Sequence, residues 1–403
     1  MVAVEHVTCC VVGGGPAGMM LSVLLARAGV KVTVLEKHGD FLRDFRGDTV
    51  HPSTLRLLDE LGLGQKFAAV PGPELTEMRM RVAGETVVAA NFGRLPGRHK
   101  HIRMVPQWDF LDLLATAEPL DLRMNTEVTG VRRTNGRVTG VTYRDADGEG
   151  ELSADLVVAC DGRDSLVRRE AGLRPLEFPL PMDVWQVRIP APPHEERDGR
   201  VFGVFGNGQV AVTMDRGEYH QTSYLIRKGE DAQLRARGLE WFRGRLAELF
   251  GWDAEVLADI RSWDDVKLLE TSMGRLPQWY VDGLLCLGDA AHTMSPVGGV
   301  GVNLAIQDAV AAARILAGPL SAGRVSKQDL AKVQKRREFP TRVAQRAQLG
   351  EHEMLLKPAL DGTLTRVPPP LRAVQRIPAL AVVAAYLGGI GVRPERAPAF
   401  ARR

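Results

Sequence analysis

A glycine-rich turn near the start of the chain constrains the fold more than any other feature of the sequence. It follows an apolar, mostly β-branched run at residues 7–12 and opens a helical pattern at residues 16–28. The glycines stand in the order Gly13-x-Gly15-x-x-Gly18. Gly13 permits a tight turn, Gly15 lets a pyrophosphate approach the backbone, and Gly18 lets the helix pack closely on the strand. The pattern predicts a nucleotide-binding strand–helix–strand unit, with the diphosphate at the helix N-terminus.

The end of the second strand indicates which nucleotide this unit holds. Residues 30–35 alternate as a strand, and Glu36 stands directly after it. A carboxylate at this position accepts ribose hydroxyls, and its charge disfavours a 2′-phosphate. The unit therefore favours FAD or NAD over NADP as the resident ligand. The cofactor-binding residues expected here are Gly13, Gly15, Pro16, Ala17, Gly18, Glu36 and Lys37.

A second glycine-rich loop, about 280 residues later, distinguishes between FAD and NAD. A short apolar strand at residues 284–287 ends in Gly288-Asp289, and residues 295–303 lead into another helix. Asp289 could bind a polyol hydroxyl, and the positive end of the helix could face an electron-rich ring edge. FAD offers both a ribityl chain and a pyrimidine edge, so we predict FAD. The loop residues expected to contact it are Asp289, Pro296, Gly299, Gly301, Val302 and Asn303.

Composition limits the class of protein without indicating a function. The chain has 403 residues, 52 Lys and Arg against 49 Asp and Glu, and a net charge of +3. This length suggests two or three domains, with a core large enough to be stable without disulfides or bound metals. The near balance of charge argues against a nucleic-acid partner, whose footprint would be a strong basic excess.

The four cysteines indicate a reducing compartment. Cys9, Cys10, Cys160 and Cys286 all lie in apolar runs, with no CxxC spacing and no histidine at metal-ligand spacing. We expect buried free thiols in a cytoplasmic protein, and no metal site.

Two uncharged segments resemble membrane signals. Residues 7–26 are interrupted by the glycine-rich turn, and residues 377–392 contain Pro378 and the pair Gly388-Gly389. The second segment has 16 residues, fewer than the ~20 that a membrane span needs. We therefore expect no integral membrane span and a buried helix at residues 377–392. A face toward a second copy, as in a homodimer, or toward a membrane surface is the alternative.

The remaining patterns place sheets between the two glycine-rich loops. Residues 126–133 and 137–144 flank Asn135-Gly136, a strong hairpin signal, and residues 76–91 and 201–227 alternate apolar with polar side chains. We predict an α/β fold made of three parts. These are a Rossmann-like FAD-binding domain of residues 1–70, 106–173 and 281–345, an inserted mixed β-sheet substrate domain of residues 71–105 and 174–280, and a C-terminal helical tail of residues 346–403.

Three motifs, in this order, resemble those of the class A, single-component FAD-dependent aromatic hydroxylases of the para-hydroxybenzoate hydroxylase and polyketide hydroxylase type. They are GGGPAG with Glu36, the segment CDGRDSLVRR at residues 160–169, and GDAAHTMSPVGGVGVN. The third motif departs from the Gly-Gly-Gln-Gly loop of many relatives. The resemblance covers most of the chain. It implies an FAD monooxygenase that uses NADPH or NADH and O₂ to hydroxylate an aromatic or polycyclic small molecule through a flavin 4a-hydroperoxide.

The resemblance also implies roles for residues outside the loops. Those assigned to FAD are Arg46, Gln107 and Asp161. Arg163 and Arg168 would contact NAD(P)H, with a solvated basic face as the alternative. Pro296 would form the wall beside the reacting oxygen, so Arg46 and Pro296 are the catalytic candidates.

The substrate sheet carries a weaker signal. Residues 182–190 alternate as a strand does, so Trp185 and Val187 share one face. Trp185 and Tyr224 are candidates for the substrate wall, with core packing as the alternative. A flavin-dependent halogenase would show a second Trp at Val187 and a lysine early in the chain, which residues 46–54 lack.

Two other functions remain open on the sequence alone. One is an FAD-dependent reductase or dehydrogenase of a polyprenyl or polycyclic substrate. The other is a flavoprotein that binds drugs or senses redox state without turnover. Substrate-stimulated NAD(P)H oxidation with incorporation of oxygen from O₂ distinguishes a monooxygenase from both.

Overall fold

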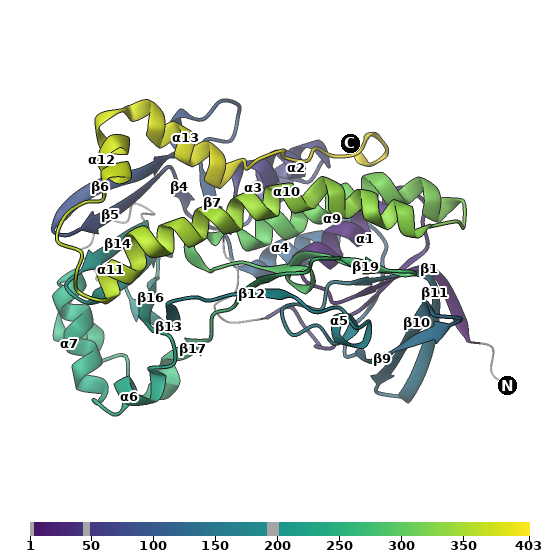
Figure 1. The fold of residues 1–403 in the computed structure, drawn as a ribbon, viewed down its shortest axis with the longest axis horizontal. Coiled ribbons are helices and arrows are strands. Elements are labelled where there is room, and N and C mark those ends of the chain that lie inside the picture. The colour runs from purple at the N-terminus through teal and green to yellow at the C-terminus, as the bar shows by residue number, and fades with distance from the viewer. Residues whose placement is uncertain (1–3, 43–48, 192–200) are drawn as a thin grey trace.

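Two large sheets joined by long helices make up the protein (Figure 1). The computed structural model describes residues 4–42, 49–191 and 201–403, so the predicted role of Arg46 lies outside the described residues. The eight-stranded sheet has a parallel core in which β1 pairs with β2 and β11. In sheet order its strands are β19 (Tyr280–Val281), β20 (Leu284–Cys286), β11 (Gly148–Ala159), β1 (Glu5–Val12), β2 (Val32–Leu35) and β8 (Asp121–Arg123), with β10 (Arg137–Asp145) and β9 (Glu127–Thr134) beyond β11.

The predicted hairpin joins β9 to β10. Asn135 and Gly136 have φ of +50° and +81°, the left-handed pair that a tight hairpin turn requires. The second sheet has seven strands and lies at the other end of the molecule (Figure 1). In order they are β17 (Lys267–Leu269), β13 (Met182–Pro190), β16 (Tyr219–Arg227), β15 (Gln209–Asp215), β14 (Val201–Gly206), β5 (Glu77–Val82) and β6 (Glu85–Asn91).

Two small three-stranded sheets connect these parts. Their strands are β12 (Leu176–Phe178), β18 (Met273–Arg275) and β21 (His292–Thr293), and then β3 (Thr49–Val50), β7 (Ile102–Met104) and β4 (Glu74–Leu75). The helices that bear on the site are α1 (Pro16–Arg27), α2 (Pro52–Glu60), α4 (Gln107–Ala115), α5 (Leu166–Glu170), α7 (Leu239–Phe250), α9 (Gly301–Ser321), α10 (Lys327–Glu351), α12 (Pro369–Arg376) and α13 (Pro378–Gly389). A π-helical turn, His352–Leu356, and α11 (Lys357–Leu360) extend α10. Helix α10 with this extension runs from the eight-stranded sheet to the seven-stranded sheet (Figure 1).

The largest hydrophobic cluster surrounds the eight-stranded sheet, and two further clusters lie on the two faces of the seven-stranded sheet. One face packs aromatic side chains against α7, and the other packs aliphatic side chains against the π-helical turn and α11. Among described helices, α9 is long and apolar enough to cross a membrane, but it is mostly buried inside the fold. The four cysteines are free thiols, as expected. The expectation of a buried helix at residues 377–392 is wrong, because α13 buries only Ala381, Ala385 and Gly389.

Candidate cofactor site

The first glycine-rich turn leaves a cradle at the N-terminus of α1. A Cβ on Gly13, whose φ is +101°, would lie 2.5 Å from the Cys160 carbonyl oxygen, and a Cβ on Gly18 would collide with the Gly13 carbonyl. A Cβ on Gly15, in contrast, would meet no atom within 4 Å. Gly15 caps α1 without any side-chain hydrogen bond, so the N–H groups of the first turn lack a capping side chain. This open, positively polarised end fits a diphosphate.

The residues predicted around the nucleotide lie at the carboxyl edge of the parallel sheet. Glu36 is buried at the end of β2, where its carboxylate accepts the Gly14 N–H at 2.7 Å and the His38 N–H at 3.0 Å. Lys37 is exposed beside it, and Gln107 begins α4, as the sequence predicts. A pocket of about 410 Å³ lies next to this edge, lined by Phe41 and Trp108 among others.

The second glycine-rich loop packs directly against the first. A Cβ on Gly288 would lie 3.3 Å from Ala17 in α1 and 3.1 Å from Ala305 in α9, so glycine lets the two helices and the loop meet. Asp289 is partly exposed in the turn that follows. Gly298 and Gly299 have φ of +79° and +60°, which gives the loop its left-handed bend before α9. The structure therefore brings the two loops, about 280 residues apart, to one site.

Asn303, predicted to contact FAD, uses its side chain to hold the chain around it. Its amide oxygen accepts the His51 N–H at 3.0 Å and the Thr54 hydroxyl at 2.8 Å. Its amide nitrogen donates to the Thr49 carbonyl at 3.0 Å. The side chain is buried, so it fixes residues 49–54 against the loop, and contact with FAD would fall to the neighbouring backbone.

Asp161 also points into its own segment. Its carboxylate accepts the Ser165 hydroxyl at 2.5 Å and the Val167 N–H at 3.2 Å, which caps α5. Burial raises the pKa of this carboxyl, and these hydrogen bonds oppose the shift. Its backbone lies against Gly13, so the segment borders the cradle while its carboxylate stabilises a helix end.

The structure corrects the interpretation of Arg168 as a contact for NAD(P)H. Its buried guanidinium donates to the Ala290 carbonyl at 3.2 Å and to the Arg163 carbonyl at 2.7 Å. It therefore ties the middle motif to the second glycine-rich loop and is almost fully buried. Arg163 is partly exposed and donates to the Glu270 carbonyl at 3.0 Å.

A stripe of buried polar side chains on α10, which the sequence analysis missed, fixes the second loop. Gln348 donates to the carbonyls of Ser295, at 3.0 Å, and Val297, at 2.6 Å, and it accepts the Ser295 N–H at 3.2 Å. His352, in the π-helical turn, contacts the Ser295 hydroxyl at 3.0 Å. The residues of this stripe are Arg337, Thr341, Gln345, Gln348 and His352. They recur every three or four positions, so the sequence does contain the signal of one buried helix face, carried by polar residues instead of apolar ones. Pro296 is exposed on the outer side of the loop that this stripe holds.

A buried ionic cluster anchors the base of the same loop. Asp308 in α9 contacts His292 at 2.6 Å and Arg337 at 2.9 Å, and Glu395 lies 3.7 Å from Arg337. Burial alone would raise the pKa of Asp308, but the imidazole and the guanidinium together lower it. Glu395 also pairs with Arg314 and Arg336, so both buried carboxylates have guanidinium partners.

Trp185 and Tyr224 do not form a substrate wall. Trp185 is fully buried, and its ring stacks on that of Tyr224 with 6.1 Å between the ring centres. Its indole N–H donates to the Asp231 carboxylate at 2.7 Å. Because residues alternate along β13, this aromatic face lies opposite the face that packs against Val297 of the second loop. The core-packing alternative is correct for both residues.

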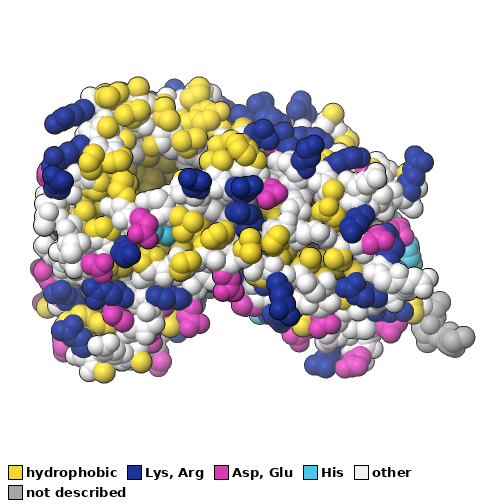
Figure 2. Space-filling view, in the orientation of Figure 1, with side chains coloured by type: hydrophobic (Ala, Val, Ile, Leu, Met, Phe, Trp, Pro, Cys, Tyr) yellow, Lys and Arg dark blue, Asp and Glu magenta, His cyan; other side chains and the backbone are white. Residues whose placement is uncertain are grey.

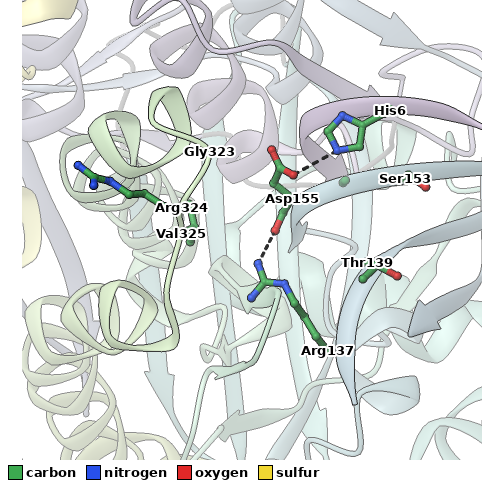
Figure 3. Close-up of a pocket in the computed structure, with 9 residues that line it drawn as sticks. His6, Arg137, Thr139, Ser153, Asp155, Gly323, Arg324 and Val325 are labelled. Atoms are coloured by element: carbon green, nitrogen blue, oxygen red, sulfur yellow. Dashed lines mark hydrogen bonds and ion pairs between the residues drawn. The ribbon is translucent and has the colours of Figure 1, made fainter. Parts of the chain in front are cut away.

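One further pocket lies at the far end of the eight-stranded sheet (Figure 3). It has a volume of about 510 Å³, and His6 and Arg137 both point toward Asp155 within it (Figure 3). The pocket lies at the amino ends of the parallel strands, whereas nucleotides bind at their carboxyl ends. No cluster of three or more potential metal ligands occurs among the described residues.

Comparison with known proteins agrees with this geometry. A family model described as an FAD binding domain matches residues 6–347. The chain is 34% identical over 380 residues to 6-methylpretetramide 4-monooxygenase of Streptomyces rimosus, covering 93% of this chain and 90% of that protein. It is 31% identical over 318 residues to 12-dehydrotetracycline 5-monooxygenase/anhydrotetracycline 6-monooxygenase from the same species, covering 74% of this chain and 60% of the relative. The fold matches PqsL of P. aeruginosa in complex with 2-aminobenzoylacetate, with a TM-score of 0.75, 24% identity and coverage of 90% of this chain and 98% of PqsL.

The fold and the paired glycine-rich loops define a nucleotide-binding protein of the α/β class. The family match over residues 6–347 is more specific. The chain belongs to the FAD-binding family of class A aromatic hydroxylases, and it is an FAD-dependent monooxygenase. The comparisons support this activity over the reductase or dehydrogenase alternative.

Proposed function

We propose that this monooxygenase hydroxylates a polycyclic aromatic polyketide, with NADH or NADPH as the electron donor. The observation that carries the proposal is the 34% identity with a 6-methylpretetramide 4-monooxygenase over nearly the full length of both chains. Similarity of this extent includes the sheet that would bind the substrate as well as the FAD site. We further propose that the seven-stranded sheet and α13 form the substrate side of the molecule.

The chain's own residues would hold FAD as follows. The N–H groups at Gly15, Ala17 and Gly18 would bind the diphosphate, and Glu36 would bind the adenosine ribose. Asp289 would bind the ribityl chain. The backbone from Gly299 to Val302 and the N-terminus of α9 would stabilise negative charge on the ring system.

The bound cofactor supplies the redox chemistry, and the protein supplies position and shielding. Gln348 and His352 hold the Ser295–Val297 segment that would line the reacting side of the ring. Pro296 on this segment offers an apolar wall that excludes water.

Steady-state oxidation of NADH and NADPH tests this function, with tetracyclic aromatic polyketides as substrates and labelled O₂ as the oxygen source. We expect oxidation to accelerate with substrate and the product to gain one labelled oxygen atom. Oxidation that no polycyclic compound stimulates would refute the substrate class. A product without labelled oxygen would refute oxygen transfer.

A further inference from the structure

Helix α13 buries its small residues and exposes large apolar ones, the reverse of an ordinary surface helix. Its buried residues are small, Ala381, Ala385 and Gly389, and they recur every four positions against β6 and the turn at Phe92. Several of its large apolar side chains face outward, whereas Val382 packs against the core. The exposed set at and just before the helix is Ile377 (52%), Val383 (51%), Tyr386 (40%) and Leu387 (53%). A contiguous exposed apolar face of this kind marks a surface that another body covers.

The chain around α13 carries a concentrated positive charge. Between Asp361 and Glu395 it contains four arginines and no acidic residue, whereas the whole protein has a net charge of only +3. Arg366, Arg376 and Arg393 are exposed, and Arg372 lies 3.8 Å from Glu85 across a half-exposed contact. The body that covers α13 should therefore be apolar and negatively charged at once.

The surface view shows these features together. Apolar side chains gather over α12 and α13, Lys and Arg side chains stand at the margins, and the surface is hollowed beside them (Figure 2). Helix α13 has 12 residues, about 18 Å of helix, against the ~30 Å core of a bilayer. It also bends by 114° from α12, so the pair cannot form one straight span. The geometry suits a helix that lies on a membrane.

We propose that α13 and its flanking arginines dock this protein on an anionic lipid bilayer, with α13 parallel to the membrane plane. The outward apolar side chains enter the interface, and the arginines pair with lipid phosphates. A second copy of the chain fits less well, because two faces rich in arginine would repel each other. The benefit of membrane docking to the enzyme rests on the proposed function. A polycyclic substrate of low solubility partitions into lipid, and from there it can reach the hollow beside α12 and α13.

Vesicle sedimentation of the FAD-loaded protein tests the docking. We expect binding to vesicles that mix phosphatidylglycerol with phosphatidylcholine, weaker binding at high salt, and little binding to phosphatidylcholine alone. The double substitution Val383→Ser with Leu387→Ser, and separately Arg372→Gln with Arg376→Gln, should each weaken binding at least tenfold. Leu176→Ser and Arg261→Gln are matched controls, exposed elsewhere, that should leave binding unchanged.

Two outcomes would overturn the proposal. One is sedimentation that the α13 substitutions do not change. The other is a dimer in solution that Val383→Ser with Leu387→Ser dissolves, without any vesicle binding, since a second copy then covers the face. Vesicle binding by a protein that hydroxylates no polycyclic compound would refute the proposed substrate and leave the docking intact.

Discussion

Replacing Gln348 by methionine tests whether α10 sets the shape of the cofactor loop. The change keeps the length of the side chain and removes three hydrogen bonds, to the carbonyls of Ser295 and Val297 and from the Ser295 N–H. A buried backbone group left without a partner costs about 1–3 kcal/mol. Pro296 is exposed, so the loop can relax toward water, and we expect a net cost of about 2–4 kcal/mol. Part of this cost should appear as FAD affinity weakened 10- to 100-fold, about 1.4–2.7 kcal/mol.

The assay is titration of the apoprotein with FAD, followed by flavin fluorescence, together with thermal unfolding of the apoprotein. Arg346→Met, on the exposed side of the same helix, is the control and should change neither quantity. If Gln348→Met lowers stability while FAD binds as in the wild type, Gln348 only supports the fold and does not set the shape of the cofactor loop. If neither quantity changes, the three hydrogen bonds contribute nothing measurable.

Three further predictions follow from single contacts. Gly15→Val should leave apoprotein unfolding unchanged and weaken FAD binding more than 100-fold, measured by fluorescence titration, because its side chain enters only the open cradle. Burial lowers the pKa of His51 from 6.5 to about 4. Between pH 6.5 and pH 4, His51 is therefore protonated in the unfolded chain and neutral in the folded protein. Stability should therefore fall by up to about 3 kcal/mol as pH drops from 6.5 to 4, and His51→Asn should remove this part of the loss in urea unfolding. Trp185→Phe should lower the free energy of unfolding by about 1–3 kcal/mol without changing the substrate KM, and a raised KM at unchanged stability would contradict the core position.

The sequence predicted those parts of the site that depend on glycine and on strand ends. The turn at Gly13 and the bend at Gly298 need backbone conformations that few residues adopt, so their pattern is visible in one dimension. Gln348 and His352 were missed because glutamine is mostly exposed in proteins and histidine is of intermediate burial, so neither indicates a buried contact. Their role depends on Ser295, which lies 53 residues before Gln348 and 57 before His352, and only tertiary packing brings them together.

The same limit explains the errors at Arg168 and α13. The sequence of a basic run does not indicate that the guanidinium of one arginine donates hydrogen bonds to two carbonyls inside the fold. An uncharged helix gives no sign of which side faces inward when both sides are apolar. In α13 the choice follows from close packing, since Gly389 lies against the ring of Phe92 where a larger residue would not fit.

The position of the polar stripe on α10 also affects when the protein can acquire its cofactor during synthesis. The cradle at Gly15 leaves the ribosome first, and Gln348 follows about 330 residues later. At 5–20 residues per second, the interval is about 15–70 s. The cradle borders Cys160, so it can form only after that residue has been made, and until Gln348 follows, the loop that faces the ring still lacks its clamp. Tight binding of FAD, visible as the yellow colour of the flavoprotein, should therefore be limited to chains in which α10 has been synthesised.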